Sequence, residues 1–314
     1  MIAPTGLNGV LRRDGDLALA RAAAAAGIPF TLSTVSNARP ATVAAAGGRL
    51  WMQLYVFDRP EMVEDIVARA DRAGCEALVF TTDANVFGSR EWDRRSFRSP
   101  GRLRMRMLLD AALHPRWALD VAVPHGLPRF VNVMDFLPPE ARSASAGVSR
   151  LLSMFRPSIN WQDLARLRDR WPRRLLVKGI LDPADVERAV GLGCDGVVLS
   201  NHGGRQLDST VAAIEVLPAI ARQFGERITI LVDGGFRRGS DIAKALALGA
   251  HGVMIGRASL YGLAAGGEAG AAHAIQILHS ELDRVLGQLG CCSLAELQPS
   301  MLRAGEPTRV GRAD

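Results

Sequence analysis

Two patterns of apolar residues alternate along this chain. Short uninterrupted apolar runs predict strands that are buried on both faces. Between them, apolar residues recur at the spacing of a helix turn, which predicts helices that cover such strands. The predicted strands are residues 28–33, 50–55, 77–82, 175–178, 196–200, 228–233 and 252–256, with an eighth at the start of the chain, residues 1–3. The predicted helices are residues 16–26, 60–73, 161–171, 183–191, 210–224 and 240–248.

Two of these helices carry start signals. Asp182 is followed by Pro183, and a capping carboxylate with a proline in the first turn is a common helix start. Gly239-Ser240-Asp241 offers a similar start to a later helix. The alternation of strand and helix therefore predicts parallel strands joined by helical crossovers.

The chain is long enough for eight such units, because a (β/α)8 barrel typically takes about 250 residues and this chain has 314. Polar residues or glycines end nearly every predicted strand: Thr5, Ser33, Gln53, Tyr55, Thr81, Asp83, Lys178, Ser200, His202, Asp233, Gly256 and Arg257. In a barrel these ends meet at one mouth, whereas in a doubly wound open sheet most of them lie apart. We therefore expect a single-domain (β/α)8 TIM barrel over residues 1–314, with the open sheet as the alternative.

A long connection, at about residues 124–160, interrupts this rhythm. Loops of such length are usually functional or disordered. Within it, Val148, Leu151, Leu152 and Phe155 fall on one helical face, with arginines nearby. One interpretation is a lid or a short helix that packs on its own barrel. The other is a basic amphipathic helix that makes peripheral contact with a membrane.

The overall charge bears on whether the protein binds nucleic acids or small anionic ligands. Lys and Arg number 38 against 32 Asp and Glu, which gives a net charge of +6 at pH 7. The basic residues are scattered and form no block, so nucleic-acid binding is not expected. A positive field suits a small anionic substrate or a phosphate-bearing cofactor.

The cysteines and the lengths of the apolar runs indicate the cellular compartment of the protein. Cys75, Cys194, Cys291 and Cys292 form no Cys-x-x-Cys pair, so no metal site is predicted and a reducing cytoplasmic compartment is the simple interpretation. No uncharged apolar run reaches the roughly 18 residues of a membrane-spanning helix. The start of the chain also lacks the pattern of a signal peptide.

Two consecutive strand–helix loops carry glycines and an arginine. Gly234 and Gly235 follow one predicted strand, with Arg237 close behind, and Gly256-Arg257 follows the next. Glycines let backbone N–H groups approach an anion, and barrels often bind phosphate at their last two loops. Tight turns alone are the alternative. The pattern predicts phosphate binding without deciding whether the phosphate belongs to a substrate or to a cofactor.

A third loop, "SNHGGRQLD" at 200–208, places a histidine and an arginine directly after a predicted strand. Together with "VKG" at 177–179, "DGGFRRG" at 233–239, "IGR" at 255–257, "QLY" at 53–55 and "TTD" at 81–83, it resembles the FMN-dependent L-2-hydroxy acid dehydrogenase and oxidase family. The resemblance runs from residue 2 to about residue 270. The segment 233–250 is also similar to IMP dehydrogenases, but the histidine loop argues against that family.

The resemblance implies roles for the residues that act on the substrate. His202 matches the general base and Asp83 the carboxylate that stabilises the charged imidazole. Lys178 matches the lysine beside the flavin, where a cation stabilises the reduced anionic ring. The residues that match groups binding the substrate carboxylate or hydroxyl are Arg205, Arg90 and Tyr55.

The resemblance also implies a binding site for FMN. The residues that match contacts to the flavin ring are Pro4, Thr5, Gly6, Ser33, Gln53, Thr81, Lys178 and Ser200. Asp233 matches the contact to the ribityl chain. The residues that match the phosphate cradle are Gly234, Gly235, Gly256, Arg237 and Arg257.

Departures from the family pattern shape the expected activity. The family has a further stretch before the first barrel strand, with a tyrosine that helps to bind the substrate carboxylate. This chain opens at Met1, so that cover of the barrel floor and part of strand 1 are expected to be missing. Gly6 stands where oxidases of the family tend to have alanine, which favours a dehydrogenase.

The resemblance implies FMN-dependent oxidation of an L-2-hydroxy acid to the 2-oxo acid. "ALHPRWALD" at 112–120 and the long connection resemble mandelate dehydrogenase-like members, so (S)-mandelate is the expected substrate type. L-lactate oxidation, by a dehydrogenase or an oxidase, and a non-catalytic FMN-binding remnant are the alternatives. The electron acceptor is a quinone, a cytochrome or oxygen. A homotetramer is expected, in the cytoplasm or peripheral at the inner face of the cytoplasmic membrane.

Overall fold

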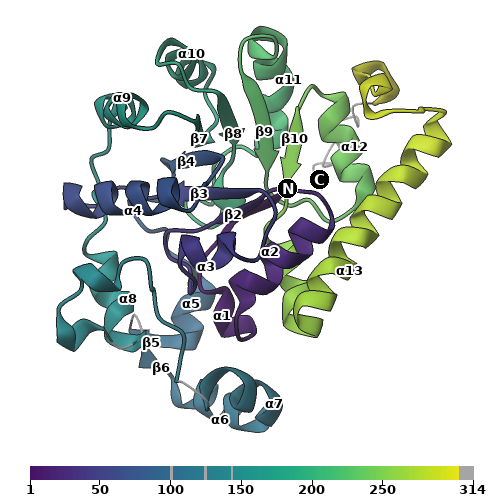
Figure 1. Cartoon of the computed structure of the whole chain (residues 1–314). Helices are drawn as coiled ribbons and strands as arrows, with labels where there is room; N and C mark the ends of the chain where they lie inside the picture. Colours follow the sequence, from purple (N-terminus) through teal and green to yellow (C-terminus); the bar gives the residue numbers. More distant parts are fainter. Residues whose placement is uncertain (100–101, 124–125, 143, 304–314) are drawn as a thin grey trace, which may run out of the picture.

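The computed structural model describes residues 1–99, 102–123, 126–142 and 144–303 of the chain. Residues 124, 125 and 143 of the predicted connection, and the end of the predicted domain, lie outside the described residues. Eight parallel strands form one sheet, in the order in which they follow along the chain (Figure 1). They are β1 (Ile2–Thr5), β2 (Phe30–Leu32), β3 (Leu50–Leu54), β4 (Ala77–Thr81), β7 (Arg174–Ile180), β8 (Gly196–Leu199), β9 (Thr229–Asp233) and β10 (Gly252–Met254).

The sheet closes on itself through its first and last strands. The N–H of Ala3 donates to the carbonyl of Ile255 (2.9 Å), and the N–H of Ile255 donates to the carbonyl of Met1 (3.0 Å). Ile2 and Ile255 form a parallel bridge. The predicted (β/α)8 barrel is therefore confirmed, and the open sheet is wrong.

Helices cover the outside of the barrel. They are α1 (Asn8–Leu11), α2 (Gly15–Ala25), α3 (Pro40–Ala44), α4 (Pro60–Arg72), α9 (Trp161–Arg170), α10 (Pro183–Gly191), α11 (Ala213–Phe224), α12 (Gly239–Ala247) and α13 (Arg257–Leu289). Both predicted start signals are confirmed: Asp182 Oδ1 accepts from the N–H of Ala184 (2.7 Å), and Asp241 Oδ2 accepts from the N–H of Arg238 (3.0 Å). The short 3-10 turns are Met134–Phe136, Pro139–Ala141, His202–Gly204, Leu294–Glu296 and Pro299–Met301.

The barrel interior holds a layer of apolar side chains. It comprises Ala3, Trp51, Ala77, Val79, Leu176, Val198, Leu231 and Met254. Successive side chains on a strand point to opposite faces, so the residue two positions later points inward again. That step leads from the apolar layer to a second, polar layer at the carboxyl ends of the strands: Thr5, Gln53, Thr81, Lys178, Ser200 and Asp233, with Gly256 beside them.

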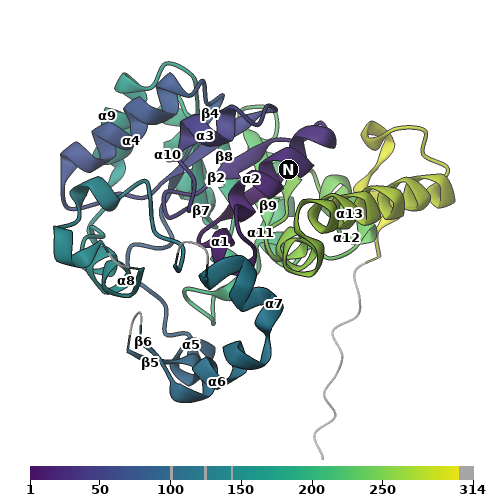
Figure 2. The ribbon, with the colours of Figure 1, turned by 60° about the horizontal axis from the view of Figure 1, so that its bottom comes forward.

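The connection between β4 and α9 is longer than the sequence pattern indicated. Its elements are α5 (Glu91–Ser96), β5 (Phe97–Ser99), β6 (Arg102–Leu103), α6 (Met105–Leu113), α7 (Pro115–Trp117), the π-helical turn Ala118–Ala122, and α8 (Ala144–Leu152). In Figure 1 and Figure 2 the segment from α5 to α7 projects away from the barrel. The prediction of a loop at 124–160 missed this first half, because its elements are short and lack a sustained period.

The apolar face predicted at 148–155 packs on the barrel, with Leu151 and Phe155 buried and Val148 and Leu152 half-buried. Leu151 and Phe155 pack against the main core. The interpretation of this face as a membrane-contacting surface is therefore wrong, and the interpretation as a helix on its own barrel is confirmed. Exposed apolar side chains lie instead on the projecting segment and on the residues that follow it: Met105, Leu109, Leu113, Leu119, Val123 and Leu127. In the described part of the chain, no helix combines the length and hydropathy needed to cross a membrane.

Candidate active site

Lys178 lies at the centre of the polar layer. Its side chain is only 3 % exposed, and Nζ lies 2.9 Å from Asp233 Oδ2 and donates to Ser200 Oγ at 2.6 Å. Burial by itself lowers the pKa of this amine, but the carboxylates of Asp233 and Asp83 outweigh burial and keep the pKa above its usual value. Lys178 is therefore a fixed cation at the mouth of the barrel.

His202 and Asp83 form a hydrogen-bonded pair beside this lysine. His202 Nδ1 lies 2.8 Å from Asp83 Oδ1, although the residues are 119 positions apart. Burial raises the pKa of Asp83, but Lys178 and His202 together hold it below its usual value. An ionised Asp83 accepts a hydrogen bond from the Nδ1–H group, so the other ring nitrogen of His202 is left to accept a proton from a substrate.

The loop that carries His202 is shaped to present this ring. His202 has φ 57°, a left-handed conformation that costs a non-glycine residue roughly 1–2 kcal/mol. Its backbone N–H donates to Ser200 Oγ at 3.0 Å, and Asn201 Oδ1 accepts from the N–H of Gly204 at 3.1 Å. These bonds offset the strain and hold the imidazole toward Asp83.

A second polar network spans the ends of β2, β3 and β4. Gln53 Nε2 donates to Thr81 Oγ1 (3.0 Å), and Ser33 Oγ donates to Gln53 Oε1 (3.2 Å). The three side chains are buried. The predicted set Ser33, Gln53 and Thr81 is therefore brought together as one preorganised surface.

Tyr55 and the two arginines lie on neighbouring loops. Burial, followed by the charge of Asp83, raises the pKa of the Tyr55 phenol, and Arg90 opposes this. Arg90 Nε donates to the backbone carbonyl of Arg205 (3.1 Å), so the loops after β4 and β8 are joined. The Arg205 side chain is exposed at this junction.

The glycine-rich loops after β9 and β10 form the third part of the site. Gly234 and Gly235 have φ of 107° and 84°, which side chains rarely adopt, and open space lies where a Cβ of Gly235 would stand. Gly256 caps the first turn of α13, a position where backbone N–H groups are free to bind an anion. Arg257 Nη2 donates to the carbonyl of Gly203 (2.9 Å), which ties this loop to the histidine loop. Arg237 instead lies over the Tyr261 ring.

Comparison with known proteins decides the family. A family model described as FMN-dependent dehydrogenase matches residues 1–304. The chain belongs to the FMN-dependent dehydrogenase family. The resemblance stated from the sequence is thereby confirmed, and this dehydrogenase is an FMN-dependent oxidoreductase.

The dehydrogenase is similar to curated relatives along its whole length. It is 46 % identical over 316 residues to (S)-mandelate dehydrogenase of Pseudomonas putida, covering 100 % of this chain and 79 % of the relative. It is 44 % identical over 307 residues to an L-lactate dehydrogenase of Caulobacter vibrioides, covering 98 % and 80 %.

Solved structures match the fold of the dehydrogenase. A crystal structure of monotopic membrane protein (S)-mandelate dehydrogenase superposes with a TM-score of 0.90 at 46 % identity, covering 97 % of this chain and 80 % of the other. A mandelate oxidase variant crystallised with (S)-mandelic acid gives a TM-score of 0.75 at 34 % identity, covering 95 % and 76 %.

The residues of the mouth fit FMN. Asp233 Oδ1 is buried and has no hydrogen-bond partner within the described residues, so it can accept from a ribityl hydroxyl. The open space beside Gly235 and the cap at Gly256 suit a phosphate. Lys178 places a cation at the level of the polar layer, where reduced flavin requires one.

Sequence reasoning missed several residues that build this site. A Cβ at Gly179 would lie 2.7 Å from Cβ of Asp83, so glycine is required for Asp83 to reach His202. Thr34 Oγ1 donates to the carbonyl of Gln53 (2.6 Å) and accepts from the N–H of Tyr55 (3.2 Å). Asn201 stabilises the histidine loop. Gly179 and Asn201 stood inside the quoted motifs, whereas nothing in the sequence distinguished Thr34 from Ser33.

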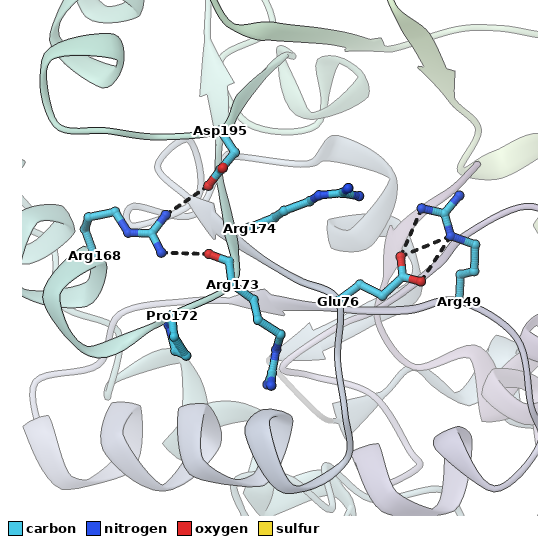
Figure 3. Close-up of a pocket in the computed structure, with 7 residues that line it drawn as sticks. All are labelled: Arg49, Glu76, Arg168, Pro172, Arg173, Arg174 and Asp195. Atoms are coloured by element: carbon cyan, nitrogen blue, oxygen red, sulfur yellow. Dashed lines mark hydrogen bonds and ion pairs between the residues drawn. The ribbon is translucent and has the colours of Figure 1, made fainter.

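A separate hollow of about 560 Å³ lies at the opposite end of the strands (Figure 3). Its residues are Arg49, Glu76, Arg168, Pro172, Arg173, Arg174 and Asp195. Arg49 pairs with Glu76 (3.0 Å) and Arg168 with Asp195 (2.9 Å), so most of its charge is neutralised internally. Ion pairs at the amino ends of barrel strands usually contribute to the stability of the fold, because active sites lie at the opposite, carboxyl end.

Proposed function

We propose that this dehydrogenase oxidises an aromatic L-2-hydroxy acid such as (S)-mandelate to the 2-oxo acid. The observation that carries this proposal is the pair of His202 and Asp83, joined at 2.8 Å beside the buried cation Lys178. L-lactate is the second candidate, because an L-lactate dehydrogenase is nearly as similar to the chain as the mandelate enzyme.

The proposed chemistry assigns one task to each group. His202 removes a proton from the substrate, and Asp83 stabilises the imidazolium that results. Arg205 and Arg90 bind the substrate carboxylate by charge-assisted hydrogen bonds. Tyr55, whose raised pKa keeps the phenol neutral, donates to the substrate oxygen. FMN, when bound, would accept the two electrons and the second proton.

The proposed cofactor site combines the polar layer around Lys178, the network of Ser33, Gln53 and Thr81, and the glycine-rich loops after β9 and β10. The flavin ring contacts Pro4, Thr5, Gly6, Ser33, Gln53, Thr81, Lys178 and Ser200. Asp233 binds the ribityl chain, and the phosphate lies among Gly234, Gly235, Gly256 and Arg257. Arg237 belongs to the same cradle as a more distant positive charge.

An aromatic cluster supports the choice of an aromatic substrate. The rings of Tyr55, Phe57, Phe87 and Phe155 lie together beside the mouth, with Phe87 39 % exposed. One methylene in a hydrophobic pocket is typically worth 1–3 kcal/mol, so apolar rings beside the proposed substrate site favour a phenyl side chain over a methyl group by about tenfold or more.

A visible absorption spectrum tests the function directly. The purified protein, supplied with FMN, should be yellow and should bleach under anaerobic conditions when (S)-mandelate is added. Bleaching with L-lactate but not (S)-mandelate would favour the second candidate. Yellow protein that no 2-hydroxy acid bleaches is the signature of a non-catalytic remnant and would overturn the proposal.

The projecting segment supports peripheral membrane contact. Met105, Leu109 and Leu113 stand at four-residue spacing on α6, and all three are exposed. Such an apolar stripe suits the interface of a bilayer. We therefore propose that the dehydrogenase binds the inner face of the cytoplasmic membrane through this segment, not through 148–155, and passes electrons to a quinone. A cytochrome and oxygen remain the alternative acceptors.

The organisation of the protein is also proposed. We infer one FMN-binding domain over residues 1–314, because the family model spans nearly all of it. Exposed apolar residues on α13, such as Ile277 and Leu289, support a homo-oligomer, for which we propose a tetramer.

All four cysteines are free thiols, which supports a cytoplasmic location.

A further inference from the structure

Phe155 is the centre of the aromatic cluster at the mouth. Its ring centroid lies 5.0 Å from that of Tyr55, 5.1 Å from that of Phe57 and 4.8 Å from that of Phe87. The contacts to Tyr55 and Phe87 are edge-to-face, at interplanar angles of 62° and 84°. One ring therefore touches the loop after β3 and the loop after β4 at once.

The backbone fixes Phe155 in this place. Phe155 pairs with Phe57 in an antiparallel bridge. The N–H of Asp58 donates to the carbonyl of Met154 (2.9 Å), and the N–H of Arg156 donates to the carbonyl of Val56 (3.1 Å). Since Leu151 and Met154 on the same stretch are also buried, the end of the long connection is anchored firmly to the barrel.

The orientation of the Tyr55 ring matters for the reaction. The charges of Asp83 and Arg90 both act on its phenol, so the hydroxyl lies in the field of the catalytic groups. The Thr34 hydroxyl holds only the backbone of Tyr55. The side-chain torsions must be fixed by neighbouring rings, and an edge-to-face contact restricts them.

We propose that Phe155 is a positioning residue, which orients the Tyr55 phenol toward the substrate oxygen. The end of the long connection is then part of the active site, besides being a cover on the barrel. This inference rests on the proposed function for the role of Tyr55, but the placement of the ring can be tested without turnover.

Kinetics of Phe155→Ala give the first test. Displacing a group by about 1 Å can cost up to about a hundredfold in rate, so we expect kcat with (S)-mandelate to fall roughly ten- to a hundredfold. Phe155→Leu, which keeps most of the apolar volume, should recover at least half of that loss on a logarithmic scale. Phe130→Ala is the matched control, because Phe130 is equally buried (6 % against 4 %) in the same connection but is not part of the cluster.

A double-mutant cycle separates positioning from general damage. In a Tyr55→Phe background the hydroxyl is absent, so Phe155→Ala should lower kcat by less than about threefold. Equal losses in both backgrounds would mean that Phe155 acts on stability alone, and the proposal would fail.

A spectroscopic readout is independent of catalysis. The chain has two tyrosines, Tyr55 and the exposed Tyr261, so protein labelled with 3-fluorotyrosine should give two ¹⁹F signals. Tyr261→Phe assigns them. Phe155→Ala should shift or broaden the Tyr55 signal and leave that of Tyr261 unchanged, and Phe130→Ala should move neither.

The outcomes distinguish the two proposals. A Tyr55 signal that is unaffected by Phe155→Ala overturns the positioning role. If the Tyr55 signal responds while the wild-type protein oxidises no 2-hydroxy acid, the proposed function fails and the structural contact stands.

Discussion

At the scale of single residues, the site depends on groups whose ordinary properties are changed by their neighbours. His202 adopts a left-handed conformation, and Lys178 keeps a positive charge in a buried place. Each is stabilised by a partner from another strand, Asp83 for the histidine and Asp233 for the lysine. Removing one member of a pair therefore affects both.

The first prediction concerns the proposed base. We expect His202→Ala to bind FMN as the wild-type protein does and to lose about 10²- to 10⁴-fold in kcat, because the proposed proton acceptor is removed. Stopped-flow measurement of flavin reduction provides the rate, and the flavin spectrum provides the occupancy. His279→Ala, at an exposed histidine, is the control. A variant that retains turnover would show that another group is the base.

The second prediction concerns the buried cation. Lys178→Ala leaves the Asp233 carboxylate buried without its partner, which typically costs about 3–5 kcal/mol in stability. We also expect weaker FMN binding and slower flavin reduction, measured by fluorescence titration and stopped flow. Lys244→Ala, the substitution at the other lysine of the chain, should change none of these. Wild-type reduction kinetics in Lys178→Ala would contradict the assigned role.

At the scale of elements, a buried carboxylate joins the loops that border the flavin site. Asp16 Oδ1 accepts from Asn8 Nδ2 (2.7 Å), and Asp16 Oδ2 accepts from the N–H of Asn37 (2.7 Å). Asn8 in turn accepts a hydrogen bond from the Thr5 hydroxyl (3.0 Å). The start of α2 thus holds the ends of β1 and β2 in place.

The third prediction follows from the pKa of Asp16. Burial raises this pKa to about 6, and the surrounding hydrogen bonds only partly oppose the rise. The folded state therefore holds the proton more tightly than the unfolded state, so stability falls as the pH rises from about 4 to about 6 and stays level above. The change amounts to roughly 3 kcal/mol, at about 1.4 kcal/mol for each pKa unit.

Thermal unfolding across this pH range measures the effect. Asp16→Asn removes the titrating group, so the Tm of wild type minus that of the variant should be larger at pH 4.5 than at pH 7. Asp14→Asn changes an exposed carboxylate next to this turn, so its Tm should vary with pH as the Tm of the wild type does. Parallel curves for Asp16→Asn would refute the raised pKa.

At the scale of the whole molecule, the barrel and the projecting segment have different surfaces. The segment is attached to the barrel by polar contacts: Trp117 Nε1 donates to the carbonyl of Val10 (2.7 Å), and Arg12 pairs with Asp120 (3.2 Å). Met105, Leu109 and Leu113 of α6 are exposed. Because the segment from α5 to α7 projects away from the barrel (Figure 2), this apolar stripe is available for the proposed contact with a bilayer.

The fourth prediction tests that surface. Leu109→Glu with Leu113→Glu places two charges on the exposed stripe of α6 and should lower binding to anionic phospholipid vesicles by at least tenfold, because each buried leucine contributes about 1.5–3 kcal/mol. Turnover with a soluble artificial acceptor should not change. Flotation with vesicles measures binding, and Leu294→Glu, at an exposed leucine of the turn Leu294–Glu296, is the control. Undiminished flotation would place the contact elsewhere.

The local pattern of the sequence determined the barrel and its chemistry. Uninterrupted apolar runs located the eight strands, and the helical period of 3.6 residues located most of the helices between them. The period of two along a strand places Gln53, Lys178 and Asp233 at the next inward position beyond the apolar interior. The family motifs covered the proposed catalytic residues. These features depend on neighbours along the chain, so the sequence carries them directly.

The tertiary structure decides which distant groups meet, and beyond the roles implied by the family motifs, no local pattern indicates these contacts. The side chains of Asp83 and His202 are joined across 119 residues, and Gly179 is needed because a third element approaches them. Both α8 and α6 carry apolar residues on one helical face, yet Leu151 of α8 is buried against the barrel, whereas Met105, Leu109 and Leu113 of α6 are exposed. Helical period shows that a face is apolar; what covers that face is set by contacts between segments far apart in the chain, which no local pattern encodes.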